Sequence, residues 1–353
     1  MSILFAGGDI GGVRCLLPVA EACLESGFDV RLVAHGAVHS EWRGESSRLL
    51  LPDGDPAGLI ERTRPDCVVF STSLTDGYAL ALARAAAAGG IPTVHVLDHW
   101  SSYAARMTTD GGPLFRPTIY TLLDDFAHRD AVADGLPEGN FLIVGQPALH
   151  DLPARRDWTP PDGPPKVLFV GEPVLRDQGG DDGNPAYRGY TELDAIDWFT
   201  RAVTSLGLSL DVHVLPHPRQ SGDELMAAWH RAGHGVPAIL ASAARGRDLF
   251  EKAHGLVGMA SMLLYEGWIF GLPVLSIQPS RRRPWLQALD GRQSAWLVDR
   301  PEQLNPGLSA WAASLSAPAP EFIEAALERS CHHQAPAAIV TAIRSCLGKG
   351  PHR

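Results

Sequence analysis

The sequence predicts an α/β protein built from two Rossmann-like parallel-sheet domains that face a cleft. Short apolar runs of four to six residues alternate with longer helical patterns, as they do in βαβ units. A segment with four prolines, residues 155–166, interrupts this pattern, and the pattern then starts again. The chain has 353 residues, a length that favours two domains over one.

The first half of the chain contains six apolar runs that we predict to be strands. They are Ile3–Ala6, Val30–Ala34, Cys67–Ser71, Thr93–Leu97, Ile119–Leu123 and Phe141–Val144, with helices at residues 13–26, 75–88 and 127–134. Residues 77–97 resemble a membrane span, but Arg84 interrupts the apolar run and residues 89–92, GGIP, break it into a helix and a strand. We therefore expect no part of the chain to cross a bilayer.

The same alternation returns in the second half. The predicted strands are Val167–Val170, Leu210–Leu215, Ala238–Leu240, Leu256–Gly258 and Val274–Ile277, with helices at residues 191–206, 222–232 and 261–270. We expect an N-terminal domain over residues 1–154, a linker over 155–166 and a C-terminal domain over 167–320. Residues 321–353 form a helical tail that is expected to pack back on the N-terminal domain.

The composition is that of an ordinary soluble globular protein, with 45% hydrophobic and 20% charged residues. A net charge of −10 argues against an electrostatic nucleic-acid binder. The five cysteines form no CxxC pair, which predicts reduced thiols in a cytoplasmic protein and no structural zinc site. The N-terminus lacks the basic start and cleavage site of a signal peptide, which agrees with that location.

Residues 254–279 are the most informative segment and predict a strand, a small-residue turn, a helix and a second buried strand. Ser261 can cap the helix, whose first N–H groups then point toward the end of the preceding strand at Gly258. Unpaired amides and the helix dipole favour a phosphate at that place. Glu266 lies over a turn further along and can accept hydrogen bonds from the hydroxyls of a ribose. The arrangement suits a nucleotide-diphosphate or nucleotide-monophosphate sugar.

A second candidate is the glycine-rich turn GGDIGGVR, residues 7–14, which follows the first strand and opens a helix. Glycines let the backbone approach a ligand, and helix amides can hold a charged group. The turn is not GxGxxG, and the second strand ends in Ala34-His35-Gly36 without an acidic residue, so dinucleotide binding has little support. The alternative interpretation is a tight strand-to-helix turn.

Asp98 and His99 follow the strand Thr93–Leu97. A carboxylate beside an imidazole at a strand end is suited to a general base that deprotonates a hydroxyl. The alternative is a histidine that only caps a loop. Asp76 and the pair Asp124-Asp125 also follow strands and are rival candidates, although aspartate is common at helix N-caps.

Three other segments follow strands of the second half. His217 and Arg219 can donate to a phosphate or carboxylate, and Pro218 stiffens their loop. Glu172 follows the first strand of this half and is expected to line the same cleft. The basic run at residues 281–283 predicts a solvated loop.

Residues 176–190 are rich in Gly and Asp, and predict either a mobile loop over the cleft or a disordered surface insertion.

Several sequence features argue against other chemistry. The pair His332-His333 has no partner at metal-ligand spacing, which predicts a surface helix. HExxH, the P-loop and G-x-S-x-G motifs are absent, so metalloprotease, NTPase and α/β-hydrolase interpretations lose their main support.

Taken in order, these segments resemble the GT-B superfamily of glycosyltransferases and its relatives, the non-hydrolysing UDP-GlcNAc 2-epimerases and the capsule or sialic-acid-locus transferases. The matching residues are GGDIGGVR, VLDHWSSYAARM (96–107), VGQPALHDL (144–152), LPHPR (215–219) and GMASMLLYEGWIFGLPVLSIQP (258–279). The resemblance covers both predicted domains.

The resemblance implies that the second domain binds the nucleotide sugar and the first binds the acceptor. Donor-binding residues would be His217, Arg219, Gly258, Ser261, the Met262 backbone and Glu266. Gly11, Gly12, Arg14 and Glu172 would face the donor phosphates across the cleft. Two departures stand out: Ala260-Ser261 replaces a Gly-Gly pair at the donor helix, and Gly12-Val13-Arg14 lacks the family histidine. The second departure shifts the expected catalytic base to Asp98 or His99.

The sequence thus predicts a cytoplasmic, metal-independent glycosyltransferase that needs no cofactor and acts on a nucleotide-sugar donor and a small-molecule or glycan acceptor. The nearest alternative is an NDP-sugar epimerase or hydrolase of the same fold. A two-lobed binding protein and a nicotinamide-dependent oxidoreductase are further alternatives. The nucleotide base, the sugar, the acceptor, the stereochemical outcome and the oligomeric state stay open.

Overall fold

The computed structural model divides the chain into two compact units. The first contains Met1–Asp151 and the segment from Glu328 onward, and the second contains Leu152–Leu327. The described residues are 1–52, 54–154, 159–184, 186–242, 246–282, 289–316 and 323–348. Residues 155–158 of the expected linker, Arg283 of the basic run and the expected domain boundary at residue 320 lie outside them.

The first unit is built on a seven-stranded sheet with the order β3-β2-β1-β4-β5-β6-β7. All of its strand pairs are parallel. The strands are β1 (Ser2–Ala6), β2 (Asp29–Val33), β3 (Leu49–Leu50), β4 (Cys67–Phe70), β5 (Thr93–His95), β6 (Ile119–Leu122) and β7 (Phe141–Ile143).

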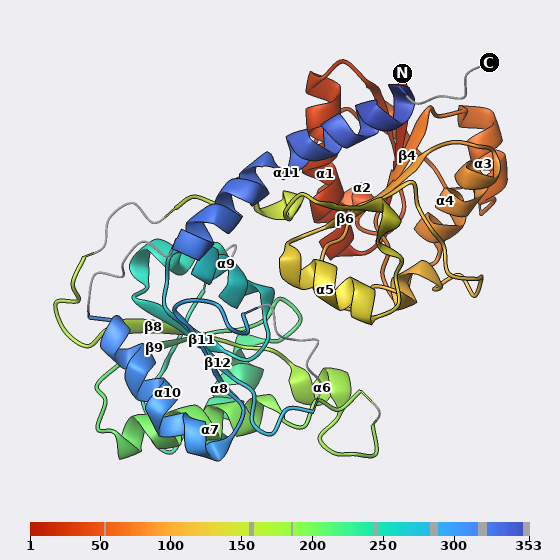
Figure 1. Cartoon of the computed structure of the whole chain (residues 1–353). Helices are drawn as coiled ribbons and strands as arrows, with labels where there is room; N and C mark the ends of the chain where they lie inside the picture. Colours follow the sequence, from red (N-terminus) through yellow and green to blue (C-terminus); the bar gives the residue numbers. More distant parts are fainter. Residues whose placement is uncertain are drawn as a thin grey trace. The chain divides into compact units, whose positions relative to one another are not determined.

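Helices cover both faces of this sheet (Figure 1). They are α1 (Ile10–Glu25), α2 (Val38–Glu41), α3 (Pro56–Thr63), α4 (Tyr78–Ala88), α5 (Asp125–Ala133) and the part of α11 (Ile323–Gly348) from Glu328 onward, with 3-10 turns η1 (Ser46–Arg48), η2 (Ala105–Met107), η3 (Glu138–Asn140) and η4 (Pro147–Leu149). In α1, Val13, Leu16, Val19 and Cys23 recur at helical spacing and bury one face. They share a core with strands β1, β2 and β4 and with Ile339 of α11.

The second unit contains a six-stranded parallel sheet with the order β10-β9-β8-β11-β12-β13. Its strands are β8 (Lys166–Val170), β9 (Asp211–Leu215), β10 (Ile239–Leu240), β11 (Gly255–Gly258), β12 (Val274–Ile277) and β13 (Ala295–Val298). Its helices are α6 (Val174–Gln178), α7 (Glu192–Ser205), α8 (Gly222–Ala232), α9 (Met262–Phe270) and α10 (Pro301–Ser314), with the 3-10 turn η5 (Gly246–Lys252).

The helices α7, α8 and α10 share one core with this sheet, and α9 lies on its other face (Figure 1). The aromatic side chains of Phe169, Phe199, Trp229 and Trp311 meet edge to face or tilted within the core, an arrangement that adds to the burial of their area. Capping boxes, Thr191 with Asp194 and Ser221 with Glu224, set where α7 and α8 begin.

Both sheets confirm the expected two Rossmann-like parallel-sheet domains. In each, the chain winds outward from the first strand in one direction and then reverses, at β1/β4 in the first sheet and at β8/β11 in the second. Ligands of open α/β sheets bind at such points, outside the carboxyl ends of the strands. The loops that follow these four strands are therefore where a site is expected.

Some elements differ from the sequence prediction. Helix α1 begins at Ile10, so that Gly11 and Gly12 lie in its first turn. The strands β3 and β13 and the helices α2, α3, α6 and α10 were not predicted. The prediction that His332 lies on a surface helix is wrong. His332 is completely buried, and its Nδ1 accepts a hydrogen bond of 2.9 Å from the Gln146 amide.

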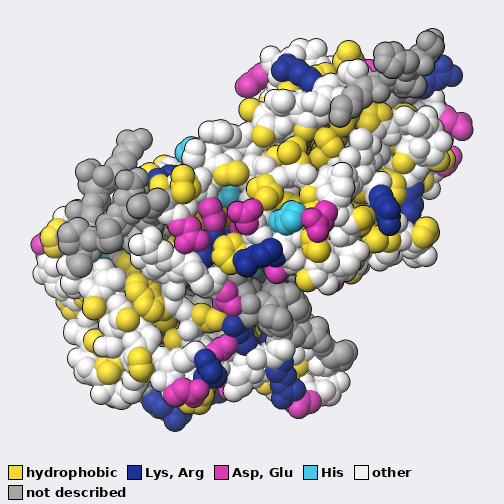
Figure 2. Space-filling view, in the orientation of Figure 1, with side chains coloured by type: hydrophobic (Ala, Val, Ile, Leu, Met, Phe, Trp, Pro, Cys, Tyr) yellow, Lys and Arg dark blue, Asp and Glu magenta, His cyan; other side chains and the backbone are white. Residues whose placement is uncertain are grey.

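The described helices include none that is both long and apolar enough to span a membrane. On the face that Figure 2 shows, acidic and basic side chains are interspersed, and no continuous basic surface is visible.

Gly145 offers a test of how the C-terminal helix packs in the first unit. Its φ is +87°, and a Cβ there would lie 2.9 Å from the backbone of Cys331 and His332. We expect Gly145→Ala to lower the free energy of unfolding by about 2–4 kcal/mol, through left-handed strain and overpacking. Gly135 (φ +95°) has nothing within 4 Å of such a Cβ, so Gly135→Ala should show the strain alone. Equal losses of the thermal unfolding midpoint in the two variants would contradict this packing.

Candidate functional site

In the second unit, the N-terminus of helix α9 lies at the point where the strand order reverses. Ser261 is the N-cap, as predicted, and its hydroxyl accepts a hydrogen bond of 3.2 Å from the Leu263 amide. Gly258 ends the buried strand β11, and a Cβ there would lie 3.1 Å from the Val170 carbonyl oxygen of β8. The absence of a side chain therefore permits the close packing of β8 and β11 that brings their loops together.

Glu172, which follows β8, occupies this helix terminus. Its Oε1 accepts a hydrogen bond of 2.6 Å from the Ala260 amide, and its Oε2 lies 3.6 Å from Nη1 of Arg188. Burial raises the pKa of Glu172, while Arg188 and hydrogen bonds from the Ala260 and Ser261 amides oppose that rise. Just before the N-cap of α9, the Ala260 amide is thus bound by a carboxylate of the chain itself.

Glu266 lies one turn into α9 and is held by η5. Its Oε2 is 3.4 Å from Nε of Arg247, and both side chains are mostly buried. A carboxylate has about four lone-pair sites, so its two oxygens can together accept several hydrogen bonds. Arg247, which the sequence analysis did not single out, fixes the direction in which Glu266 points.

His217 and Arg219 follow β9 in one tight loop. The Arg219 amide donates to Nδ1 of His217 over 3.1 Å. Burial, together with the nearby Arg219 and Arg176 guanidinium groups, lowers the pKa of His217. The imidazole is therefore neutral at neutral pH, and since Nδ1 accepts, Nε2 carries the proton and can donate to a ligand.

The guanidinium of Arg219 forms a two-pronged ion pair with Asp177 of α6. The Nη1–Oδ1 and Nη2–Oδ2 distances are 3.1 and 2.6 Å. Arg176 of the same helix donates to the Arg219 carbonyl oxygen over 2.5 Å. The short helix α6, which the sequence did not predict, therefore holds the loop that carries Arg219.

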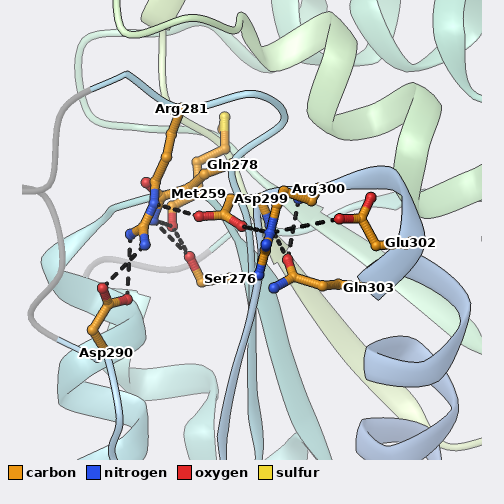
Figure 3. Close-up of polar contacts among 9 residues, drawn as sticks. All are labelled: Met259, Ser276, Gln278, Arg281, Asp290, Asp299, Arg300, Glu302 and Gln303. Atoms are coloured by element: carbon orange, nitrogen blue, oxygen red, sulfur yellow. Dashed lines mark hydrogen bonds and ion pairs between the residues drawn. The ribbon is translucent and has the colours of Figure 1, made fainter.

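A third polar group follows β12 and β13 (Figure 3). Gln278 donates through Nε2 to the Met259 carbonyl oxygen and to Ser276 Oγ, over 3.2 and 2.9 Å. The bond to Met259 ties the loop between β11 and α9 to the end of β12. The sequence did not predict a role for Ser276 or Gln278. A buried serine or glutamine beside an apolar run gives no local indication of its hydrogen-bond partners.

The prediction of a solvated basic loop is wrong for Arg281. Its side chain is 14% exposed and forms ion pairs with Asp299, at 2.8 Å, and with Asp290, at 3.2 Å (Figure 3). Burial raises the pKa of Asp290, and Arg281 opposes the rise. Arg282 is more exposed and is paired with Asp182.

In the first unit, Asp98 lies in a buried polar network beside helix α1. Its Oδ1 accepts from Arg106, whose guanidinium also donates to the Thr72 and Ser101 carbonyl oxygens over 2.8 and 3.1 Å. A Cβ on Gly11 would lie 2.6 Å from Asp98 Oδ2. The carboxylate thus lies against the first turn of α1, where the helix dipole favours negative charge.

Asp9 joins this group, although the sequence analysis did not select it. Partial burial, and the charges of Asp98 and Asp76, raise its pKa, while Arg106 opposes the rise. Asp9 is the N-cap residue of α1, but its side chain makes no capping hydrogen bond. A carboxyl group with a raised pKa near other carboxylates is a candidate for proton transfer.

The other predicted residues of this unit have structural partners. His99 Nδ1 is 3.1 Å from Ser101 Oγ. Arg14 is mostly exposed and pairs with Glu41 at 3.1 Å. Asp124 caps α5, and Asp76 accepts from the Tyr78 amide at the start of α4 and contacts His35, so both rivals serve as helix-start carboxylates.

Within the described ranges, no three His, Cys, Asp or Glu side chains gather in an arrangement that could hold a metal ion.

No protein-family model matches the chain, and no curated protein sequence matches it either. Solved structures, in contrast, align along nearly all of it. The UDP-GlcNAc 2-epimerase from Neisseria meningitidis, solved with bound UDP-GlcNAc, has a TM-score of 0.61 at 12% identity and covers 98% of this chain and 100% of its own. MurG from Acinetobacter baumannii has a TM-score of 0.61 at 13% identity, with coverages of 98% and 99%.

A glycosyltransferase from Rickettsia africae ESF-5 has a TM-score of 0.66 at 10% identity and covers 99% of both chains. The chain has the GT-B fold. This fold is shared by enzymes with different activities, so the activity has to be inferred from the residues of the site.

The buried pair of Arg106 and Asp98 gives a direct test of the network in the first GT-B unit. Their side chains are 8% and 9% exposed. Arg106→Met should lower the free energy of unfolding by about 3 kcal/mol, because a buried carboxylate then has no counter-charge. The double variant Asp98→Asn/Arg106→Met should recover part of the loss in urea denaturation. Arg14→Met, which breaks an exposed pair, should cost under about 1 kcal/mol; a similarly small cost for Arg106→Met would contradict the network.

Proposed function

We propose that this chain is a metal-independent glycosyltransferase that moves a sugar from a nucleotide-sugar donor to a hydroxyl acceptor. The observation that supports this most is the position of the α9 terminus and Glu266 together at the β8/β11 reversal of the second sheet. Amides suited to phosphate and a carboxylate suited to a ribose lie on one helix, a turn apart. The fold likeness to a glycosyltransferase and to an epimerase bound to UDP-GlcNAc supports the same class of ligand.

In this proposal the second unit binds the donor. The amides of residues 260–262 and the Nε2–H of His217 donate hydrogen bonds to the phosphate oxygens, and Arg219 adds a positive charge. Glu266, directed by Arg247, accepts from the ribose hydroxyls. Charge that develops on the departing phosphate is stabilised by these fixed donors, which is the role that a divalent cation has in other transferases.

The first unit binds the acceptor and supplies the base. Asp98 and His99 are the proposed candidates for removing the proton of the acceptor hydroxyl as it attacks the anomeric carbon. The raised pKa of Asp9 adds a third candidate that binds a proton more readily than an ordinary aspartate.

Thermal shift against UDP-, GDP-, CMP-, CDP- and dTDP-sugars tests donor binding. One nucleotide class should raise the unfolding midpoint, since a ligand at 100 times its Kd adds about 2.7 kcal/mol of stability. Glu266→Ala and Arg219→Ala should lose most of that rise. Glu251→Ala, an exposed change on the neighbouring η5, should keep it. Undiminished shifts in the first two variants would refute the donor-site assignment.

The base is tested by turnover of the donor that gives the shift. Asp98→Asn or His99→Ala should lower the rate of nucleotide release by about 10²–10⁴-fold, the usual contribution of general-base catalysis. The nucleotide-sugar affinity of the same variants should stay within a factor of about two, because the proposed donor-binding residues belong to the second unit. If turnover is unchanged in both and falls in Asp9→Asn, the proton acceptor is Asp9 instead.

An NDP-sugar epimerase or hydrolase is the second candidate, favoured by the alignment with UDP-GlcNAc 2-epimerases over 98% of the chain. Incubation with the stabilising nucleotide sugar and no acceptor separates the two. Conversion of the sugar under those conditions indicates the epimerase or hydrolase, whereas turnover that requires an added acceptor indicates transfer.

A further inference from the structure

Two groups of the second unit that can bind anions each hold a carboxylate of the chain. The Ala260 amide, at the start of α9, donates to Glu172 over 2.6 Å. The Arg219 guanidinium holds Asp177 over 2.6 and 3.1 Å. Carboxylate and phosphate oxygens accept the same hydrogen bonds, so a ligand phosphate and these side chains compete for the same donors.

Glu172 is placed as a bound anion would be. Its side chain is 12% exposed, and Arg188 lies 3.6 Å from its second oxygen. Tyr190, completely buried, lies close enough that the Glu172 charge contributes to raising its pKa, after burial itself. Arg188 opposes that rise, through its charge and a hydrogen bond to the Tyr190 hydroxyl. Arg188 thus interacts with both Glu172 and Tyr190.

Asp177 lies on the same short segment as Glu172. The segment runs from the end of β8 into α6 and is held at Leu175, whose amide donates to Glu192 Oε2 over 2.7 Å. Arg176 adds a hydrogen bond to the Arg219 carbonyl oxygen. One stretch of seven residues, 172–178, thus supplies the carboxylates for both groups.

We propose that Glu172 and Asp177 are internal competitors of the ligand phosphate, which set the affinity of this site and give up their hydrogen bonds when a phosphorylated ligand binds. This inference rests on the proposed nucleotide-sugar function of the second unit. It assigns to the segment 172–178 the role of tuning how strongly phosphate is held. A site that releases a nucleotide after each turnover needs such a limit on its affinity for phosphate.

Isothermal titration of the full chain with inorganic pyrophosphate tests the inference. Glu172→Gln should bind about tenfold more tightly than the parent, because a neutral amide oxygen competes less well than a carboxylate for the Ala260 N–H. Asp177→Asn should gain about threefold, since its ion pair is partly exposed. The glutamine retains an oxygen that can accept from Ala260, and thermal unfolding will verify that each variant is folded.

Two matched variants control for the loss of negative charge. Asp124→Asn removes a buried carboxylate that accepts a backbone hydrogen bond of 2.7 Å from Ala127 at the start of α5, in the first unit. Asp197→Asn breaks an ion pair in which Nη2 of Arg201 donates to both carboxylate oxygens. The exposed fractions of Asp197 and Arg201, 28% and 65%, match the 26% and 62% of Asp177 and Arg219. Both controls should bind pyrophosphate as the parent does.

The outcomes separate this inference from the proposed function. Unchanged or weaker pyrophosphate binding in Glu172→Gln and Asp177→Asn, no binding at all, or equal gains in the controls would overturn the inference. If the two variants gain and no nucleotide sugar stabilises any form of the chain, the inference stands and the proposed function fails. If nucleotide sugars stabilise the parent and variants equally, the proposed function stands and the inference fails.

Discussion

The hydrogen bond from the Ala260 amide to the Glu172 carboxylate joins the loops on either side of the reversal point in the second sheet. It depends on the parallel pairing of β8 and β11, which brings two segments 88 residues apart in sequence to one edge. Gly258 permits that pairing, and Ser276 and Gln278 hold the Met259 carbonyl oxygen beneath it. The position of α9, and with it Glu266, follows from these contacts.

The first unit also has a carboxylate with an arginine partner at a helix start, formed by different residues. There the carboxylate near the helix start is Asp98, which lies against Gly11 in the first turn of α1 and is balanced by Arg106. In both units the positive end of a helix at the reversal point is accompanied by a carboxylate with an arginine partner. In each pair the carboxylate and the arginine balance each other's charge. An anionic ligand that binds there must therefore displace the carboxylate from its donors.

Local signals in the sequence predicted much of the framework. The Ser261 cap, the apolar runs of the central strands and the Gly-Leu-Pro break each depend on neighbours within a few residues, and the structure confirms them. The edge strands β3 and β13 were missed because their residues are only partly buried and show weak patterning. Helices α3 and α10 carry proline in the first turn, which is a helix-start signal present in the sequence itself.

The partners of the site residues could not be predicted in the same way. Nothing near Arg219 in sequence points to Asp177, and nothing near Glu266 points to Arg247, because each pair forms only when the sheet is assembled. The sequence identified residue types suited to phosphate and ribose. It could not show that Glu172 binds the Ala260 amide, since that contact is a consequence of topology.

The most direct measurement is a crystal structure of the chain with its stabilising nucleotide sugar bound. We predict phosphate density at the amides of residues 260–262, a ribose beside Glu266 and the Glu172 carboxylate turned away from Ala260. Phosphate density at any other place, with the bond between Ala260 and Glu172 intact, would contradict this prediction.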